Sequence, residues 1–318
     1  MAFYNFENLF DTISDPDTNK ILQDEFTPEG AKKWNTPKYY EKLDNMALVV
    51  SKLGVEKVEG GPAVLGLSEI ENRSVLEDFV VQEKVKSRNY QIVHYDSPDK
   101  RGIDVALLYN PTYFKFLSSQ TYTVKNPEDS TWFTRDQLLV TGELNGERVH
   151  VIVAHWPSRR GGQKKSSPKR ELAADVGRSV VDSILLAEPN AKIFYMGDLN
   201  DDPIDPSVRK SLGSIGKIEK LEPGNLFNPM ESFYKKGIGT LGYRDAWNLF
   251  DQIIISQELL KTDYSSYRYH NAVIYNKDYL KQKSGKYIGY PKRTYSFGQY
   301  NGGYSDHFPV YIFLIKES

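Results

Sequence analysis

Short apolar runs separated by polar turns recur along most of this chain, and their length and composition predict β-strands. The expected strands cover residues 63–70, 90–95, 103–109, 114–124, 137–144, 148–155, 191–196, 252–255 and 310–315, and a further one begins at Ala2. The runs between residues 103 and 155 leave no room for helices between them. They predict antiparallel hairpins, one of which is closed by the two-residue turn Asn145-Gly146.

Three other segments carry apolar residues at helical spacing. Residues 39–53 repeat them every three or four positions. Ser74, with a glutamate three residues later, predicts a capping box and a helix reaching about residue 85. The Ser-Pro pair at 167–168 predicts the cap and first turn of a third helix, whose apolar stripe continues to Ile184.

This mixture of elements predicts an α+β protein, a four-layer α/β/β/α sandwich of two mixed, mostly antiparallel sheets with the helices outside. No internal repeat or linker-like stretch is visible, so we expect a single domain over residues 1–318. Hydrophobic residues make up 39% of the chain, enough for a sizeable core. The chain has no cysteine, which excludes disulfides, thiolate metal sites and cysteine nucleophiles.

Charge and hydropathy limit the partners. The net charge of −1 excludes a polycation that coats nucleic acid, so any affinity for phosphate must come from local patches or from a metal ion. No apolar stretch approaches the length of a membrane helix. We expect a soluble monomer. Its compartment stays open, with export and a leader absent from this chain as one alternative.

Two motifs place acids, amides and a histidine where an apolar run stops. The segment MGDLN at 196–200 follows one expected strand, and SDHFP at 305–309 precedes another. Strand ends can present polar groups to a ligand without burying them unpaired. Because Asp, Asn and His together suit a hard divalent cation and a phosphoester, the two motifs predict a site for such ligands.

Other strand ends carry polar groups of the same types, namely Asn5, Glu7, Glu69, His155 and Asp251. Each has an ordinary structural explanation when taken alone. Asp-Asn after glycine is typical of a turn or helix cap, a lone histidine is usually hydrogen-bonded within the structure, and Asp251 could pair with Arg244. The set and its order along the chain are what favour a functional site.

That order resembles the endonuclease/exonuclease/phosphatase superfamily, and deoxyribonuclease I within it. The resemblance is carried by FYNFENLF, LSEIEN, AHWPS, GDLND, FDQIII and SDHFP, and it spans nearly the whole chain. It implies a two-sheet sandwich flanked by helices. It also implies a phosphoesterase that depends on a divalent metal, Mg²⁺ or alternatively Mn²⁺.

The resemblance further implies the metal ligands. Glu69 would be the main Mg²⁺ ligand, with Asp306 and Glu7 completing the carboxylate shell. Mg²⁺ is commonly bound by few carboxylates together with water, so such a sparse set is reasonable. Ser68 stands where many members carry Gln, and we expect metal binding to survive this difference.

The same resemblance implies the groups that act on the phosphoester. Asp198 would orient or deprotonate the attacking water, while Asn200 and Asn5 would hydrogen-bond the phosphate. Asp251 would orient His307 and raise its pKa, so that a cationic ring could donate to a phosphate oxygen. His155 resembles the deoxyribonuclease I histidine.

Basic and aromatic segments flank these motifs. The run 158–170 holds six cations directly after His155, and Arg159 and Arg160 are candidates for phosphate contact, although a solvated loop is the ordinary explanation. Arg101 is a further candidate beside Asp104. The tyrosine-rich stretch before SDHFP, with its interleaved cations, could stack nucleic-acid bases or simply form an edge strand with its loops.

The leading hypothesis is therefore a Mg²⁺-dependent phosphodiesterase that hydrolyses nucleic acid by in-line attack of an activated water. The alternative substrate is a small phosphoester, such as a phospholipid headgroup or inositol phosphate. A catalytically silent binding module on the same fold is the hypothesis from a different class. The sequence does not distinguish DNA from RNA, or endonuclease from exonuclease cleavage.

Overall fold

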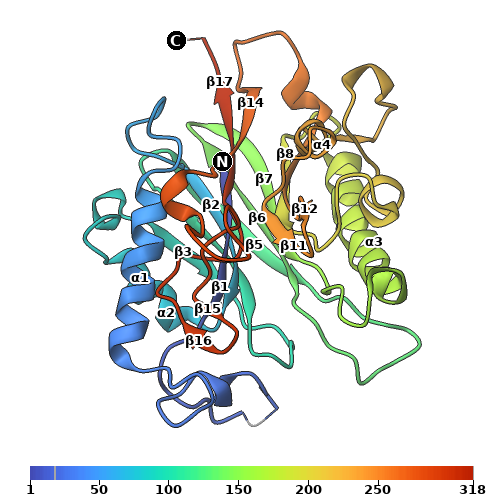
Figure 1. The fold of residues 1–318 in the computed structure, drawn as a ribbon. Coiled ribbons are helices and arrows are strands. Elements are labelled where there is room, and N and C mark those ends of the chain that lie inside the picture. The colour runs from blue at the N-terminus through green and yellow to red at the C-terminus, as the bar shows by residue number, and fades with distance from the viewer. Residues whose placement is uncertain (18, 318) are drawn as a thin grey trace.

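The computed structural model describes residues 1–17 and 19–317, and its alternating strands form two large sheets packed face to face (Figure 1). The first sheet has six strands, with β1 and β2 at its centre as its one parallel pair within the described residues. Across the sheet the order is β14 (Arg268–Ile274), β17 (Val310–Ile315), β1 (Ala2–Leu9), β2 (Val64–Ile70), β4 (Asp104–Tyr109) and β3 (Gln91–His94).

The second sheet has seven strands and contains two of the expected hairpins, those that join run 114–124 to 137–144 and run 137–144 to 148–155. The expected hairpin between runs 103–109 and 114–124 is wrong, because β4 pairs with β2 and β3 in the first sheet while the next strand belongs to the second. Its order is β5 (Phe114–Tyr122), β6 (Gln137–Leu144), β7 (Glu147–His155), β8 (Ile193–Asp198), β13 (Asp251–Ser256), β10 (Leu226–Phe227) and β9 (Ser214–Ile215). Pairs β7–β8 and β9–β10 are parallel, so this sheet is also mixed. Two small hairpins accompany the sheets, β11 (Leu241–Tyr243) with β12 (Ala246–Asn248) and β15 (Tyr295–Ser296) with β16 (Gln299–Tyr300).

Helices cover the outer faces of the sandwich. α1 (Thr36–Ser51) and α2 (Arg73–Val80) lie against the six-stranded sheet, and α3 (Gln163–Ala187) lies on the opposite side of the molecule (Figure 1). Shorter helical segments are α4 (Met230–Lys235), the 3-10 turns Gln23–Glu25, Lys86–Arg88, Ile218–Lys220, Gln257–Leu260 and Asp278–Leu280, and the π-helical turn Ser207–Ser211. The four-layer α/β/β/α fold predicted from the sequence is confirmed. No helix in the described part of the chain combines the length and apolarity needed to cross a membrane.

The alternation of side chains along β8 explains how the layers hold together. Phe194 and Met196 point into the large core between the sheets, whereas Ile193 and Tyr195 point outward into a second core. That second core also contains Val180 from α3. Burying each large apolar side chain contributes about 1.5–3 kcal/mol, so both faces of this sheet stabilise the fold.

Two helix starts differ from the prediction. α2 is capped by Asn72, whose side chain accepts the backbone N–H of Val75 at 3.1 Å, while Ser74 lies inside the first turn. Glu77 pairs instead with Arg73, so the expected capping box does not form. The helix also ends at Val80 rather than near residue 85.

α3 begins at Gln163, one turn before the expected cap at Ser167, and Pro168 lies inside it. Ser167 uses its hydroxyl within the helix, donating to Glu171 at 2.8 Å. The Ser-Pro pair therefore marks the first turns of this helix but not its first residue.

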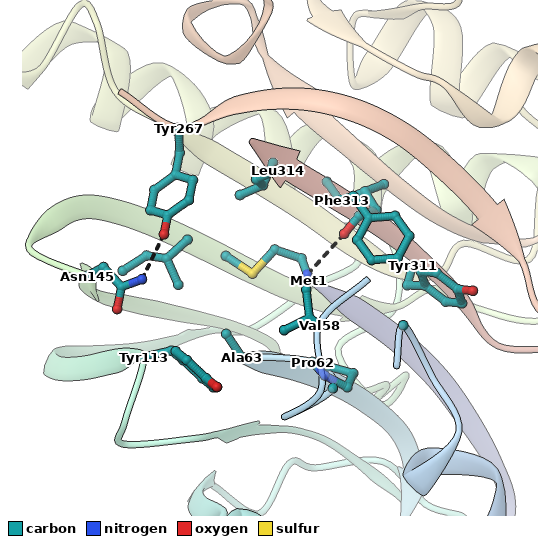
Figure 2. A pocket seen from close by; sticks show the side chains of 14 residues that line it. Met1, Val58, Pro62, Ala63, Tyr113, Asn145, Tyr267, Tyr311, Phe313 and Leu314 are labelled. Carbon is teal, nitrogen blue, oxygen red and sulfur yellow. Dashed lines mark hydrogen bonds between the residues drawn. The ribbon is translucent and has the colours of Figure 1, made fainter. Parts of the chain in front are cut away.

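An apolar cavity of about 200 Å³ opens at the end of the sandwich where β1 begins (Figure 2). Met1, Tyr113, Tyr311 and Phe313 are among its lining residues. The amino group of Met1 donates to the carbonyl of Ile312 at 3.2 Å, and burial lowers its pKa to about 5. This lining offers little to a phosphoester, and the polar strand ends lie elsewhere.

Candidate active site

Strand ends from both sheets bring the predicted polar side chains together. In the seven-stranded sheet, strand pairing aligns His155 of β7 with Asp198 of β8, and Asp198 with Asp251 of β13. Aligned residues on neighbouring strands project from the same face of a sheet. Met196, two positions before Asp198, lies in the core between the sheets, so this row faces the six-stranded sheet.

Asp198 is the centre of the group. Its Oδ2 accepts a hydrogen bond from Nδ2 of Asn5 at 3.0 Å and lies 3.5 Å from Nε2 of His155 and 3.8 Å from Nε2 of His307. Its Oδ1 accepts the backbone N–H of Asn200 at 3.0 Å. Burial raises the pKa of Asp198 to about 6, which suits a carboxylate that must accept a proton near neutral pH.

His307 is held in its protonated form by neighbouring carboxylates. Its Nδ1 lies 2.6 Å from Oδ2 of Asp251, and both residues are buried. Burial alone would lower the pKa of His307, but the negative charges of Asp251 and Asp198 raise it well above its usual value. Asp251 therefore pairs with His307 and not with Arg244. The remaining ring nitrogen lies 3.8 Å from Asp306.

His155 has the opposite electrostatic setting. Burial and the nearby guanidinium groups of Arg135 and Arg101 lower its pKa well below the usual value. Arg135 also donates to the carbonyl oxygen of His155 at 3.1 Å, which fixes the end of β7. Nε2 of the neutral ring lies 4.0 Å from Oε1 of Glu69, in addition to its contact with Asp198. One neutral and one protonated histidine thus share a single buried carboxylate.

Backbone distortions in β1 and β2 position the acidic side chains of these strands. Glu7, Asn8 and Glu69 have φ angles of 47°, 53° and 61°, and the pairing registers of β1 and β2 shift at these positions. Non-glycine residues seldom adopt such angles, and irregularities of this kind redirect side chains next to active sites. The N–H of Asn8 donates to Oε2 of Glu69 at 2.9 Å, which links the two distortions. Ser68 pairs with Asn5 across the same strands.

Two of the three carboxylates expected to bind metal, those of Glu7 and Asp306, pair with a guanidinium that the sequence analysis did not single out. Arg293 forms an ion pair with Asp306, and its Nε lies 3.6 Å from Oε1 of Glu7. The charges of Asp306, Glu7 and Glu69 raise the pKa of Arg293. On its buried side, Glu7 accepts the N–H of Thr294 at 2.7 Å, and burial raises its pKa to about 7.

This donor set fits a hard divalent cation. Carboxylate oxygens are the protein ligands that Mg²⁺ prefers, and here carboxylates from separate segments already enclose a positive charge. Asp198, Asp251 and His307 also place ligand-type atoms within 4.8 Å of one another. The hydrogen bond between His307 and Asp251 occupies part of that second group.

The three arginines expected to bind substrate have different surroundings in the structure. Arg101 lies at the site, with one terminal nitrogen 4.0 Å from Glu69 and the other buried without a hydrogen-bond partner among the described residues. Arg160 is exposed on the segment before α3.

Arg159 has a structural setting instead, because its guanidinium donates to the carbonyl of Asn200 and to the carboxylates of Asp202 and Asp205. It also lies over the ring of Phe250, 4.5 Å from the centroid. This geometry braces the loop after Asp198, and it corrects the expectation that Arg159 is available for phosphate.

Sequence reasoning also missed two supporting residues. Ser305 donates to the carbonyl of Asn5 at 2.7 Å and accepts the N–H of His307 at 3.1 Å, so it links β1 to the histidine. Lys42 is fully buried in α1 and lies 3.7 Å from Oε2 of Glu7. A lysine within the apolar stripe of residues 39–53 was the signal that could have revealed it. The side chain of Asn200 donates to the carbonyl of Trp156 at 2.9 Å.

Comparisons with solved structures agree with this architecture. Humanized TDP2 of D. rerio is 17% identical, with a TM-score of 0.57, and the match covers 98% of this chain and 97% of that chain. For a mannosyl-6-phosphatase of Bacteroides thetaiotaomicron, the identity is 16%, the TM-score 0.58, and the coverage 99% and 98%. D. rerio TDP2 complexed with a single-strand DNA product is 16% identical, with a TM-score of 0.55 and coverage of 86% and 92%. At these identities the likeness shows the fold alone.

Sequence comparison gives the family. No curated protein sequence matches this chain significantly. A family model described as endonuclease/exonuclease/phosphatase family matches residues 1–316, nearly the whole chain. The match agrees with the order of the motifs and with the convergence of their residues between the sheets. The chain therefore belongs to the endonuclease/exonuclease/phosphatase family of phosphoester hydrolases.

Proposed function

We propose that this protein hydrolyses a phosphodiester of nucleic acid by in-line attack of water, with the help of a divalent metal ion. The observation that carries the proposal is the surroundings of Asp198. A buried carboxylate with a pKa of about 6 contacts Asn5 and lies within 4 Å of one neutral and one protonated histidine. Such a group can take a proton from water while its neighbours handle the charge of the phosphoryl group.

Each side chain has a role in this scheme. Asp198 accepts the proton of the attacking water, and neutral His155 orients Asp198 through Nε2. Protonated His307, held by Asp251, donates to a non-bridging phosphate oxygen. The amides of Asn5 and Asn200 position the phosphate from either side of Asp198.

Glu69, Asp306 and Glu7 are the residues that would hold the ion, which we take to be Mg²⁺ with Mn²⁺ as the alternative. A divalent ion bound there supplies positive charge to the phosphoryl oxygens and to the leaving oxygen. Carboxylates at this position without a cation would instead repel an anionic substrate.

Pairs of a cation and an aromatic ring support a nucleic-acid substrate. Lys100 lies over the ring of Phe133, which is 46% exposed, and Lys169 lies over the ring of Trp132. Arg160 is exposed on the segment before α3. Arg101 lies near Glu69, and its second terminal nitrogen has no hydrogen-bond partner among the described residues. Interleaved aromatic and cationic groups can stack bases and follow a phosphate backbone. One structure of the same fold, D. rerio TDP2, is complexed with single-strand DNA.

A small phosphoester is the second candidate, and the setting of Arg159 favours it. Arg159 pairs with Asp205, and Nε of Arg170 lies 2.7 Å from Asp201. These two cations of the basic run 158–170 are therefore used within the protein and are not available to a long phosphate backbone. A mannosyl-6-phosphatase is another structure of the same fold.

A substrate panel separates the two candidates. DNA, RNA, a phospholipid and a sugar phosphate are each offered with Mg²⁺, with Mn²⁺ and with excess chelator. Nucleic-acid cleavage that falls steeply with salt supports the proposal. Turnover confined to the phospholipid or the sugar phosphate supports the second candidate, and no turnover in any arm contradicts both.

A further inference from the structure

Arg293 lies against two of the carboxylates proposed to hold the ion, Glu7 and Asp306. Its side chain is 48% exposed, and its guanidinium pairs with Asp306 and lies 3.6 Å from Glu7. Asp306 directly precedes His307, whose Nε2 lies 3.8 Å from the same carboxylate. The half-exposed side chain of Arg293 therefore pairs with the same carboxylate, Asp306, that lies near protonated His307.

The backbone under Arg293 is fixed from three directions. The N–H of Thr294 donates to Glu7 at 2.7 Å, and buried Lys42 donates to Oγ1 of Thr294 and to the carbonyl of Tyr304, each at 2.6 Å. Gly303 packs against the carbonyl of Arg293 so closely that an added Cβ would lie 2.2 Å from its oxygen. The side chain can therefore turn while its anchor stays in place.

We propose that Arg293 is a phosphate-binding residue of this site, which rests on the carboxylates of Glu7 and Asp306 in the ion-free protein and pairs with the substrate's phosphoryl oxygens once a divalent ion is bound. The inference rests on the proposed function, because it takes these carboxylates as ligands of the ion.

Charge and shape support the exchange of partners. A guanidinium and a divalent cation compete for the same carboxylate oxygens, so binding of the ion releases Arg293. The planar fork of the released guanidinium matches two oxygens of a phosphate. It then lies on the Asp306 side of the phosphoryl group, next to His307.

Binding measurements on Arg293→Gln test the proposal. Without a competing guanidinium, the variant binds Mn²⁺ about three- to tenfold more tightly than the wild type, measured by calorimetry without substrate. With saturating Mn²⁺, its affinity for inorganic phosphate falls about tenfold or more. The matched control is Arg209→Gln, because Arg209 is similarly exposed (42%) and also pairs with a carboxylate, that of Glu231. The control leaves both affinities unchanged.

The outcomes separate this inference from the proposed function. If Arg293→Gln binds Mn²⁺ and phosphate as the wild type does, or binds Mn²⁺ more weakly, Arg293 has a structural role and the inference is overturned. If the wild type itself binds no Mn²⁺, the metal dependence of the proposed function fails, and this inference fails with it. Circular dichroism of both variants shows whether the fold is retained.

Discussion

Oδ2 of Asp251 lies 2.6 Å from Nδ1 of His307, although the two residues are 56 positions apart in the chain. The contact joins the start of β13 in one sheet to the segment that enters β17 in the other. Both groups are buried, so water screens their attraction only weakly. This pair therefore sets the charge of the histidine that lies 3.8 Å from Asp198.

The first prediction concerns Asp251→Asn. Without the carboxylate, burial dominates and the pKa of His307 falls, so the ring loses its proton at lower pH. We expect turnover to fall about 10²–10³-fold at neutral pH and the alkaline limb of the pH–rate profile to move to lower pH. Histidine NMR titration measures the pKa directly. His150, which pairs with Glu188, serves as the internal reference and keeps its titration. An unchanged pKa of His307 would refute this account of its charge.

The second prediction concerns the stability cost of Asp198. Its pKa is raised to about 6 in the folded state, above the ordinary value for an aspartate. Protonation therefore favours the fold, and this contribution is full below the ordinary aspartate pKa and is lost as the pH rises through about 6.

We therefore expect Asp198→Asn to be more stable than the wild type by about 1–3 kcal/mol at alkaline pH, with the difference shrinking toward zero in acid. Thermal unfolding of both proteins across the pH range measures it, and turnover is lost in the variant. A variant that is less stable at alkaline pH would show that Asp198 stabilises the fold in its ionised form.

Arg159 and Arg101 were both expected from the sequence to bind substrate, but their substitutions should have different effects. Arg159→Gln leaves the carboxylates of Asp202 and Asp205 without their cation, which we expect to cost roughly 2–4 kcal/mol of stability. Arg101→Gln removes a group at the site with a nitrogen that has no hydrogen-bond partner among the described residues, so we expect a higher KM with little change in unfolding temperature. Unfolding and steady-state kinetics of both variants test the contrast. If the two variants changed KM and stability to the same extent, the separate roles of Arg159 and Arg101 would be wrong.

A fourth prediction tests the start of α2. Asn72→Ala removes the side chain that accepts the N–H of Val75 and should destabilise the protein by about 1 kcal/mol. Ser74→Ala, two residues later in the first turn, should change stability by less than about 0.5 kcal/mol. Chemical denaturation of the two variants compares them. If Ser74→Ala destabilised the protein more than Asn72→Ala, the capping box predicted from the sequence would be supported.

The convergence of distant motifs could be predicted because strand ends are recognisable in sequence. His155, Asp198 and Asp251 each adjoin an apolar run, and neighbouring strands in register bring such residues into one row. The family resemblance supplied the pairing of Asp251 with His307, which no local pattern contains.

The remaining features depend on tertiary contacts. Arg159 lies in a basic run, and only the positions of Asp202 and Asp205 reveal that its charge is used within the protein. Arg293 belongs to a long irregular segment between β14 and β17, whose path is fixed by Lys42 and Glu7 from elsewhere in the chain. Local propensity likewise favoured the serine caps of α2 and α3, whereas α2 is capped by Asn72 and α3 begins at Gln163.

Metal dependence at Glu69 tests the central claim most directly. Phosphoester turnover is measured after chelation and after Mg²⁺ is restored, for the wild type, Glu69→Gln and the control Glu143→Gln, which changes a glutamate of β6 paired with Lys115. We predict that chelation abolishes activity, that Mg²⁺ restores it in the wild type and the control, and that Glu69→Gln stays about 10³-fold slower with its fold intact. Activity that survives chelation, or wild-type turnover by Glu69→Gln, would contradict the account.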